Sequence, residues 1–135
     1  MKRITDKMQE IGGFLDELEA IAPSSFDKYK SSIEKRAACE RYVEKVVEAV
    51  TDLAFLIVKY RKFRMPEDDT DAFNILLENK IIDGSLSAKM KDAKGMRNII
   101  AHQYGHIDDE LVFNSINELQ KDVLEFIERI KSRLS

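Results

Sequence analysis

One long helical seam limits what this chain can fold into. Between residues 32 and 62, apolar side chains recur at alternating spacings of four and three. That pattern is typical of a helix packed nearly parallel or antiparallel to another helix. The seam consists of Cys39, Val43, Val46, Val50, Leu53, Ile57 and Tyr60. Val47, Phe55 and Leu56 widen it, so this helix is predicted to lie at the centre of a bundle.

Four further helices are predicted around the central one. They span about residues 2–20, about 71–79, about 86–102 and a last segment capped by Asp108 or Asp109. Ser31, with Glu34 three residues later, resembles a capping box that would start the central helix. The residues expected to be buried in the outer helices are Ile4, Met8, Ile11, Leu15, Leu18, Phe73, Leu76, Leu77, Leu111, Ile116, Leu119, Val123, Phe126, Ile127 and Ile130. No segment alternates as a strand would, so the fold class is predicted to be all-α, an antiparallel bundle of about five helices.

Composition narrows the class of protein further. The chain has 135 residues, 44% of them hydrophobic, with two prolines and five glycines, which predicts one folded domain over residues 1–135. A net charge of −3 excludes a strong overall attraction to nucleic acid, so any such binding needs a local patch. The single cysteine, Cys39, excludes an intrachain disulfide and suits a reducing cytosol. Nothing resembles a signal peptide or a membrane helix, so a cytoplasmic protein without membrane contact is expected.

The stretch MRNIIAHQYGH, residues 96–106, gathers the polar residues that carry chemistry: Arg97, Asn98, His102 and Tyr104. Residues five apart lie about 140° apart around an α-helix, so Arg97 and His102 do not line one face of an unbroken helix. Two arrangements would bring them together. Either the helix ends near His102 and the histidine turns back, or two chains pair and each supplies residues to a common cleft.

The residue types suit cleavage of RNA. Histidine titrates near neutral pH and can take the proton of a 2′-hydroxyl or give one to the leaving oxygen. Arginine stays charged and can stabilise the charge that builds on phosphorus. The nucleophile belongs to the substrate, so neither a metal nor a cofactor is expected. The alternative is structural, with Arg97 in a surface salt bridge and His102 at a helix C-terminus, where a cation is favoured.

The stretch RNIIAHQY also resembles the signature of the HEPN superfamily of small helical ribonucleases. A tyrosine two residues after the histidine is the version found in HepT-like toxins, whose antitoxins are minimal nucleotidyltransferases. EKRAACERYVEKVVEAV is similar to the long second helix of that family, and FNILLENKIIDGSLSAKMKDAKGMRNIIAHQYGHID is similar to its run into the active-site helix. The resemblance covers about residues 32–127.

The resemblance implies a role for each residue of the motif. Arg97 and His102 would be catalytic, and Asn98 would support them by hydrogen bonding. The chain would be a metal-independent endoribonuclease toxin of a type VII-like toxin–antitoxin system, cutting tRNA or mRNA in the cleft of a HEPN-like homodimer. The nucleotidyltransferase would attach AMP to Tyr104. The added phosphate would then compete with RNA for Arg97 and His102.

The sequence leaves two points open: the role of the lysines before Arg97, and whether the chain is a nuclease or one of two other kinds of protein. The lysines that lead into Arg97, among them Lys89, Lys91 and Lys94, are either an RNA-binding patch or an ordinary solvated face. The same arginine and histidine would also suit a non-catalytic helical subunit that binds a nucleotide or RNA beside a nucleotidyltransferase. A helical dimer without chemistry is the third possibility.

Overall fold

The structure, a computed structural model, describes residues 1–102 and 107–134. All regular secondary structure in these residues is helical, which confirms the all-α prediction. The six helices of this part are α1 (Lys2–Ile21), α2 (Phe26–Lys30), α3 (Ile33–Tyr60), α4 (Asp69–Glu78), α5 (Gly84–His102) and α6 (Asp109–Leu134). The short α2 was not predicted.

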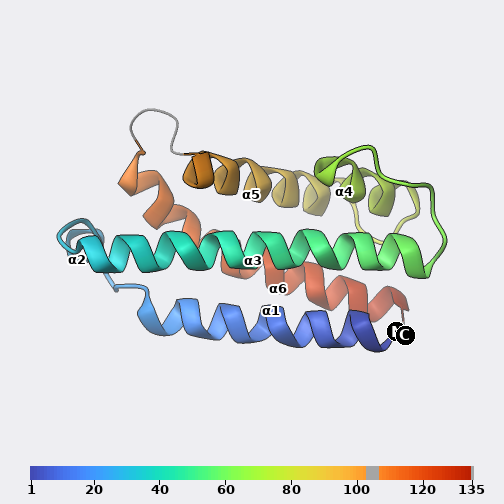
Figure 1. Ribbon diagram of the computed structural model, residues 1–135, viewed down its shortest axis with the longest axis horizontal. Coiled ribbons are helices and arrows are strands. Elements are labelled where there is room, and N and C mark those ends of the chain that lie inside the picture. The colour runs from blue at the N-terminus through green and yellow to red at the C-terminus, as the bar shows by residue number, and fades with distance from the viewer. Residues whose placement is uncertain (103–106, 135) are drawn as a thin grey trace.

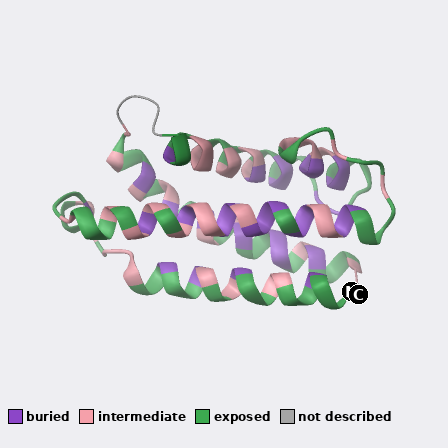
Figure 2. Ribbon diagram, viewed as in Figure 1, coloured by how far each residue is buried: buried purple, intermediate pink, exposed green. Residues whose placement is uncertain are grey.

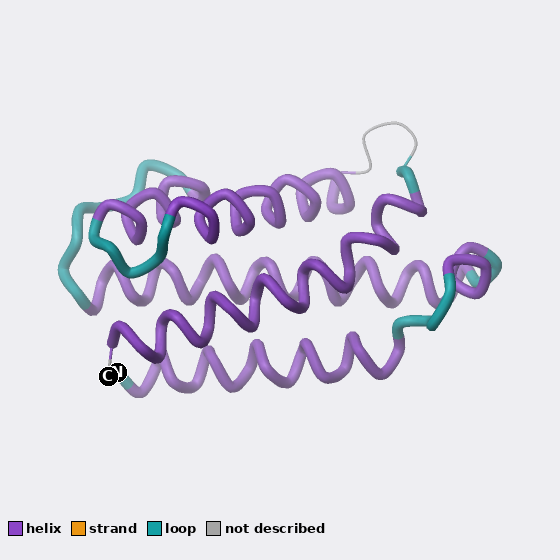
Figure 3. Tube along the Cα trace, turned by 180° about the vertical axis from the view of Figure 1, so that it is seen from behind, coloured by secondary structure: helices purple, strands orange, loops and turns teal. Residues whose placement is uncertain are grey.

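The long helices form an antiparallel bundle around α3. Figure 1 shows α3 running the length of the molecule, with α1 along one side and α5 along the other, both in the opposite direction. Seen from behind, α6 crosses the bundle obliquely and runs opposite to α5 (Figure 3). The α4 helix packs against α3 and α5 at the end where α3 finishes. The predicted pairing of two chains concerns a second copy and stays a prediction.

The predicted seam of α3 is the centre of the core. Its residues from Cys39 to Ile57 are buried, and buried and exposed positions alternate along the helix (Figure 2). Burying one such aliphatic side chain stabilises the fold by about 1.5–3 kcal/mol. Tyr60 is the exception, with 49% of its surface exposed, because it is the last residue of α3 and extends past the neighbouring helices.

Local sequence explains where the helices begin. The Ser25 hydroxyl accepts a hydrogen bond from the Lys28 amide at 3.3 Å and starts α2. The capping serine of α3 is Ser32, whose hydroxyl accepts from the Lys35 amide at 3.1 Å. The prediction of Ser31 was therefore wrong by one residue, because Ser31 ends α2 instead.

The start of α6 confirms one of the two predicted capping residues, whereas its buried stripe corrects the prediction. The Asp108 carboxylate accepts from the Leu111 amide at 3.2 Å, so Asp108 is the capping residue. The buried stripe then begins at Val112, and Leu111, about 100° further round, is 50% exposed. Leu77 on α4 is likewise 37% exposed beside the fully buried Leu76. Both leucines were predicted to be buried.

Among residues 1–102 and 107–134, no helix combines the length and the apolar content that crossing a bilayer requires.

Candidate functional site

The α5 helix carries the motif, and it places Arg97 on its core-facing side. Leu86, Met90, Ala93, Arg97 and Ile100 follow one another at spacings of four, three, four and three. Leu86, Met90 and Ile100 are buried, and Ala93 packs against the core. Arg97 therefore occupies a position that the helical pattern reserves for an apolar residue.

The guanidinium of Arg97 is held from the neighbouring helix α3. Its Nη2 atom lies 2.6 Å from Oε1 of Glu48, a short charge-assisted hydrogen bond. Its Nη1 atom donates a longer bond of 3.4 Å to Oδ1 of Asn98. Nε is buried and has no hydrogen-bond partner among the described residues. The side chain of Arg97 is 22% exposed, so its terminal nitrogens lie at the edge of the core and not on the open surface.

Glu48 is a residue of the candidate site that the sequence analysis missed. It is 43% exposed and belongs to a line of acidic residues, Glu44, Glu48 and Asp52, spaced by four beside the apolar seam of α3. An arginine in the core stripe of one helix requires an acidic partner on the next, because an unpaired buried charge is costly. That requirement is the signal that would have pointed to Glu48.

His102 is the last residue of α5, and it is exposed. A cation is favoured there by the dipole of the helix. The backbone stays helical from Arg97 through His102. Arg97 forms an ion pair, as the structural alternative expects. The residues that follow His102, on which one of the two predicted arrangements depends, lie outside the described part of the chain.

Asn98 and Ile99 complete the described part of the motif. Asn98 is half-buried and accepts the 3.4 Å hydrogen bond from Arg97 described above, and its supporting role stays a prediction. Ile99 is 44% exposed, so the end of α5 presents an apolar side chain to solvent next to the polar ones. Tyr104, the predicted acceptor of AMP, lies outside the described residues.

The three lysines of the predicted RNA-binding patch have different surroundings. Lys89 lies 3.9 Å from Asp122 and 3.7 Å from Glu125. Lys94 is only 12% exposed and lies 2.9 Å from Asp69. Lys91 forms no ion pair with any described residue. These acidic partners come from α4 and α6, and they could not be recognised from the sequence around the lysines.

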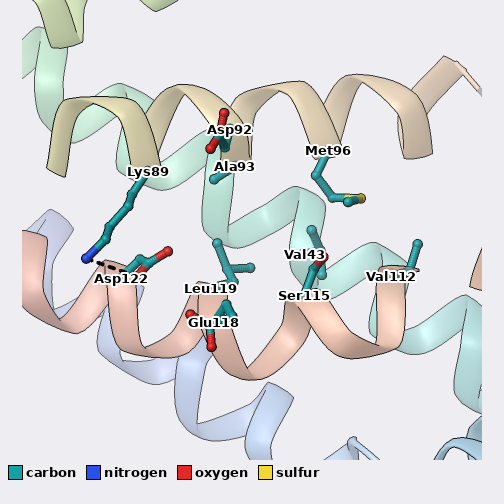
Figure 4. A pocket seen from close by; sticks show the side chains of 10 residues that line it. All are labelled: Val43, Lys89, Asp92, Ala93, Met96, Val112, Ser115, Glu118, Leu119 and Asp122. Atoms are coloured by element: carbon teal, nitrogen blue, oxygen red, sulfur yellow. Dashed lines mark ion pairs between the residues drawn. The ribbon is translucent and has the colours of Figure 1, made fainter. Parts of the chain in front are cut away.

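A cavity of about 220 Å³ lies between α5 and α6, one residue away from Arg97. Figure 4 shows Met96 and Ala93 pointing into it from α5, above Leu119 of α6. The ion pair of Lys89 with Asp122 crosses between the two helices at one side of the cavity (Figure 4). Burial raises the pKa of the Asp122 carboxyl, and Lys89 opposes that shift. The described residues contain no group of three potential metal ligands.

Known proteins of similar sequence share most of this chain. The family described as "Ribonuclease HepT-like" matches residues 11–130. The tRNA nuclease HepT of Aphanizomenon flos-aquae is 28% identical over 131 residues, which cover 97% of this chain and 89% of that protein. A protein of Archaeoglobus fulgidus is 35% identical over 88 residues, and this chain spans only 66% of its length.

A solved structure shows the same fold. The tri-AMPylated HEPN toxin of Shewanella oneidensis, in complex with an MNT antitoxin, superposes with a TM-score of 0.89. It is 23% identical, and the match covers 96% of each chain. Helices, motif and sequence match agree, and the chain belongs to the HepT-like ribonuclease family.

Proposed function

We propose that this chain is a metal-independent endoribonuclease, the toxin of a type VII-like toxin–antitoxin pair, and that residues 1–135 form its single HEPN-like domain. The observation that carries the proposal is the position of Arg97. A charged side chain stands in the core stripe of α5, fixed by Glu48, five residues before an exposed histidine. An arginine that served only to solvate the surface would lie on the exposed face of α5 and not in its core-facing stripe.

In the proposed reaction the substrate supplies the nucleophile. His102 takes the proton from a ribose 2′-hydroxyl, and the oxygen attacks the adjacent phosphorus. The bond from phosphorus to the 5′-oxygen breaks, and that oxygen leaves with the proton that His102 took and now returns. Arg97 donates hydrogen bonds to the phosphate oxygens as negative charge builds on them, and Asn98 helps to hold the guanidinium. DNA lacks the 2′-hydroxyl and is spared.

The proposed active form is a homodimer. Arg97 and His102 are separated by about 140° around α5, so a second copy is the simplest way to surround one phosphate with both residue types. The exposed Ile99 gives the end of α5 an apolar contact for such a copy. The solved relative is a toxin bound to its antitoxin, which supports a nucleotidyltransferase as partner of this chain as well.

The proposed regulation acts at Tyr104. The solved relative carries AMP groups, and we assign the acceptor in this chain to Tyr104, two residues after His102. AMP attached there brings a phosphate next to Arg97 and His102, where it competes with tRNA or mRNA. Of the three lysines in the predicted patch, Lys91 is the strongest candidate for a phosphate contact, since Lys89 and Lys94 already have acidic partners.

The test is an RNA cleavage assay in EDTA that compares the wild-type protein with Arg97→Ala and His102→Ala. The wild type should cut RNA, and both variants should lose at least about a hundredfold in rate, as expected for removal of a general base or a charge-stabilising donor. Cleavage that persists in either variant would refute the assignment of that residue. A matched control is Arg133→Ala, an exposed arginine of the last turn of α6.

Failure of the wild type to cut has two distinct meanings. An intact mass increased by whole AMP units would identify a silenced toxin, and Tyr104→Phe protein should then cut. An unmodified protein that binds RNA without cutting it would favour the non-catalytic subunit of a nucleotidyltransferase complex.

A further inference from the structure

A second concave surface lies at the other end of the bundle from the last residue of α5. It is a groove of about 880 Å³ formed by the beginning of α1, the last turns of α3 and the segment that follows α3. Figure 1 shows these parts at the same end of the molecule, because α1 and α3 run in opposite directions. The groove is four times larger than the cavity beside Arg97, and none of the predicted site residues lines it.

The groove is basic in a chain that is acidic. Its lining contains four cationic side chains and one carboxylate, although the whole chain has a net charge of −3. Arg3, Lys59 and Lys62 are exposed and form no ion pair with any described residue. Lys7 lies 2.8 Å from Glu10 and 3.8 Å from Asp52, so its charge is shared between two carboxylates, and the positive charge of the groove comes mainly from the other three cations. Such a concentration of unbalanced positive charge attracts a polyanion, and the attraction weakens with salt.

The floor of the groove is apolar and contains two aromatic rings. Phe55 and Phe63 are half-buried, and Met65 is 85% exposed. The guanidinium of Arg61 lies over the ring of Phe63, at 5.7 Å from its centroid. Aromatic rings between cationic side chains are the usual means of binding single-stranded nucleic acid, since bases stack on the rings while phosphates meet the charges. An acidic protein surface would use the charges but would not require the rings.

The groove lies on the stripe of α3 that leads away from Arg97. Glu48, which holds Arg97, and Lys59 are eleven residues apart, so they lie about 20° apart around the helix and about 16 Å apart along it. Asp52 and Phe55 lie on the same stripe between them. Glu48 and Asp52 are each paired with a cation, so the path from Arg97 to Lys59 carries little net negative charge.

We propose that this groove binds single-stranded RNA, holding nucleotides to one side of the phosphate that is cut. Phosphates lie against Arg3, Lys59 and Lys62, and a base stacks on Phe63. The inference rests on the proposed function, because it assigns part of the RNA substrate to a second surface. It adds a binding contribution that is separate from cleavage.

The test measures RNA binding without cleavage. A 5′-fluorescein-labelled poly(U) strand is titrated with His102→Ala protein, and fluorescence anisotropy is recorded between about 50 and 200 mM salt. Lys59→Glu and Lys62→Glu are added singly to this background. The matched control is Lys121→Glu, an exposed lysine of α6 without an ion pair among the described residues, which changes the net charge by the same amount.

Each groove variant should bind poly(U) about three- to tenfold more weakly than the control and should lower the slope of log affinity against log salt by about 0.7. Phe63→Leu keeps an apolar side chain and removes the ring, so it should weaken binding about fivefold or more with an unchanged salt slope. Circular dichroism melts show whether each variant is folded.

If the groove variants and Phe63→Leu bind poly(U) as the control does, the inference is overturned, and the basic groove is left to an acidic protein partner. That result is distinguishable from failure of the proposed function, which shows in the cleavage assay of the otherwise wild-type protein. Intact cleavage with unchanged binding refutes only the groove, whereas weakened binding without cleavage refutes only the nuclease.

Discussion

Glu48→Ala should release the Arg97 guanidinium from its ion pair and reduce both the free energy of unfolding and the rate of RNA cleavage. In the folded protein, Arg97 has one short bond, of 2.6 Å, to Glu48 and one long bond, of 3.4 Å, to Asn98. Its Nε atom is already buried without a partner. Without the carboxylate, the guanidinium keeps only the weak contact to Asn98, and the charge must either remain poorly paired in the core stripe or turn out to solvent.

The size of the effect follows from the burial of the pair. Exposed ion pairs contribute about 0.2–1 kcal/mol, and removing one partner of a fully buried pair costs about 3–5 kcal/mol. The side chains here are 22% and 43% exposed, which places the loss of stability at about 1–2 kcal/mol. If the same energy is lost from the positioning of Arg97 in the transition state, cleavage falls about 5- to 30-fold.

The assays are urea unfolding at neutral pH and initial rates of RNA cleavage. Glu48→Gln keeps an oxygen that accepts the hydrogen bond, so it should recover part of both losses. The matched control is Glu44→Ala, one turn earlier on α3, where the carboxylate has only a 3.9 Å contact with Arg41. Its effect on stability should stay within about 0.5 kcal/mol.

Two results would refute this reasoning. Wild-type stability and rate in Glu48→Ala would mean that the pair does not position Arg97. Faster cleavage and tighter RNA binding in Glu48→Ala would mean that Glu48 competes with the substrate phosphate for the guanidinium. In that case the ion pair with Glu48 would inhibit cleavage, because it would hold the guanidinium away from the substrate phosphate.

Three further predictions concern the scaffold. Hydrogen bonds from Arg64 hold the pKa of Asp71 well below its usual range and lower the pKa of Glu78. This contribution to stability is therefore complete above about pH 5 and is lost as the pH falls through the folded-state pKa values. Asp71→Asn should flatten the acid side of a plot of urea midpoint against pH. Lys80 has a φ of 60°, in the left-handed region, and its exposed side chain forms no ion pair with a described residue. Lys80→Gly should therefore raise the free energy of unfolding by about 0.5–1 kcal/mol. An unchanged or lower urea midpoint would contradict this. Burial raises the pKa of the Cys39 thiol. A thiol reagent such as DTNB should therefore react slowly with the native protein and fast in guanidinium chloride. Rapid reaction of the folded protein would show that α3 opens locally.

Periodicity predicted the long elements because it records burial directly. The α3 seam and the α6 stripe contain enough turns that one exception does not hide the pattern. At their ends the pattern is weakest. Tyr60 satisfies the spacing rule yet is exposed, since it is the last residue of α3, and Leu111, next to the buried Val112, is exposed because it points away from the stripe.

The short α2 helix could not be predicted in this way. Five residues make little more than one turn, so no helical period can be seen in them. What holds the segment is tertiary: Tyr29 is fully buried, and its ring lies 5.3 Å from that of Phe113 on α6. The serine pair between α2 and α3 was ambiguous for the same reason, since each helix end uses one serine.

At the candidate site, the contacts between helices were the main feature that the sequence could not predict. The motif residues were identified by their spacing in one helix, but the partners of Lys89, Lys94 and Arg97 come from α6, α4 and α3. Those pairings depend on how the helices are rotated against each other. No pattern within α5 contains that rotation.

The sequence nevertheless contains a second signal at Arg97, which is visible only when the whole of α5 is considered and not the motif alone. The stripe of Leu86, Met90, Ala93 and Ile100 is regular, and Arg97 interrupts it at a core position. A chain selected only for stability would place an apolar residue there, because a buried ion pair is often no more stable than an apolar replacement of similar size. Local rules are broken in this way mainly where function requires it. Arg97→Met, which fills the stripe, should therefore leave the protein as stable as the wild type or more so, while abolishing cleavage. A loss of stability equal to that of Glu48→Ala would show instead that the arginine is there for the fold.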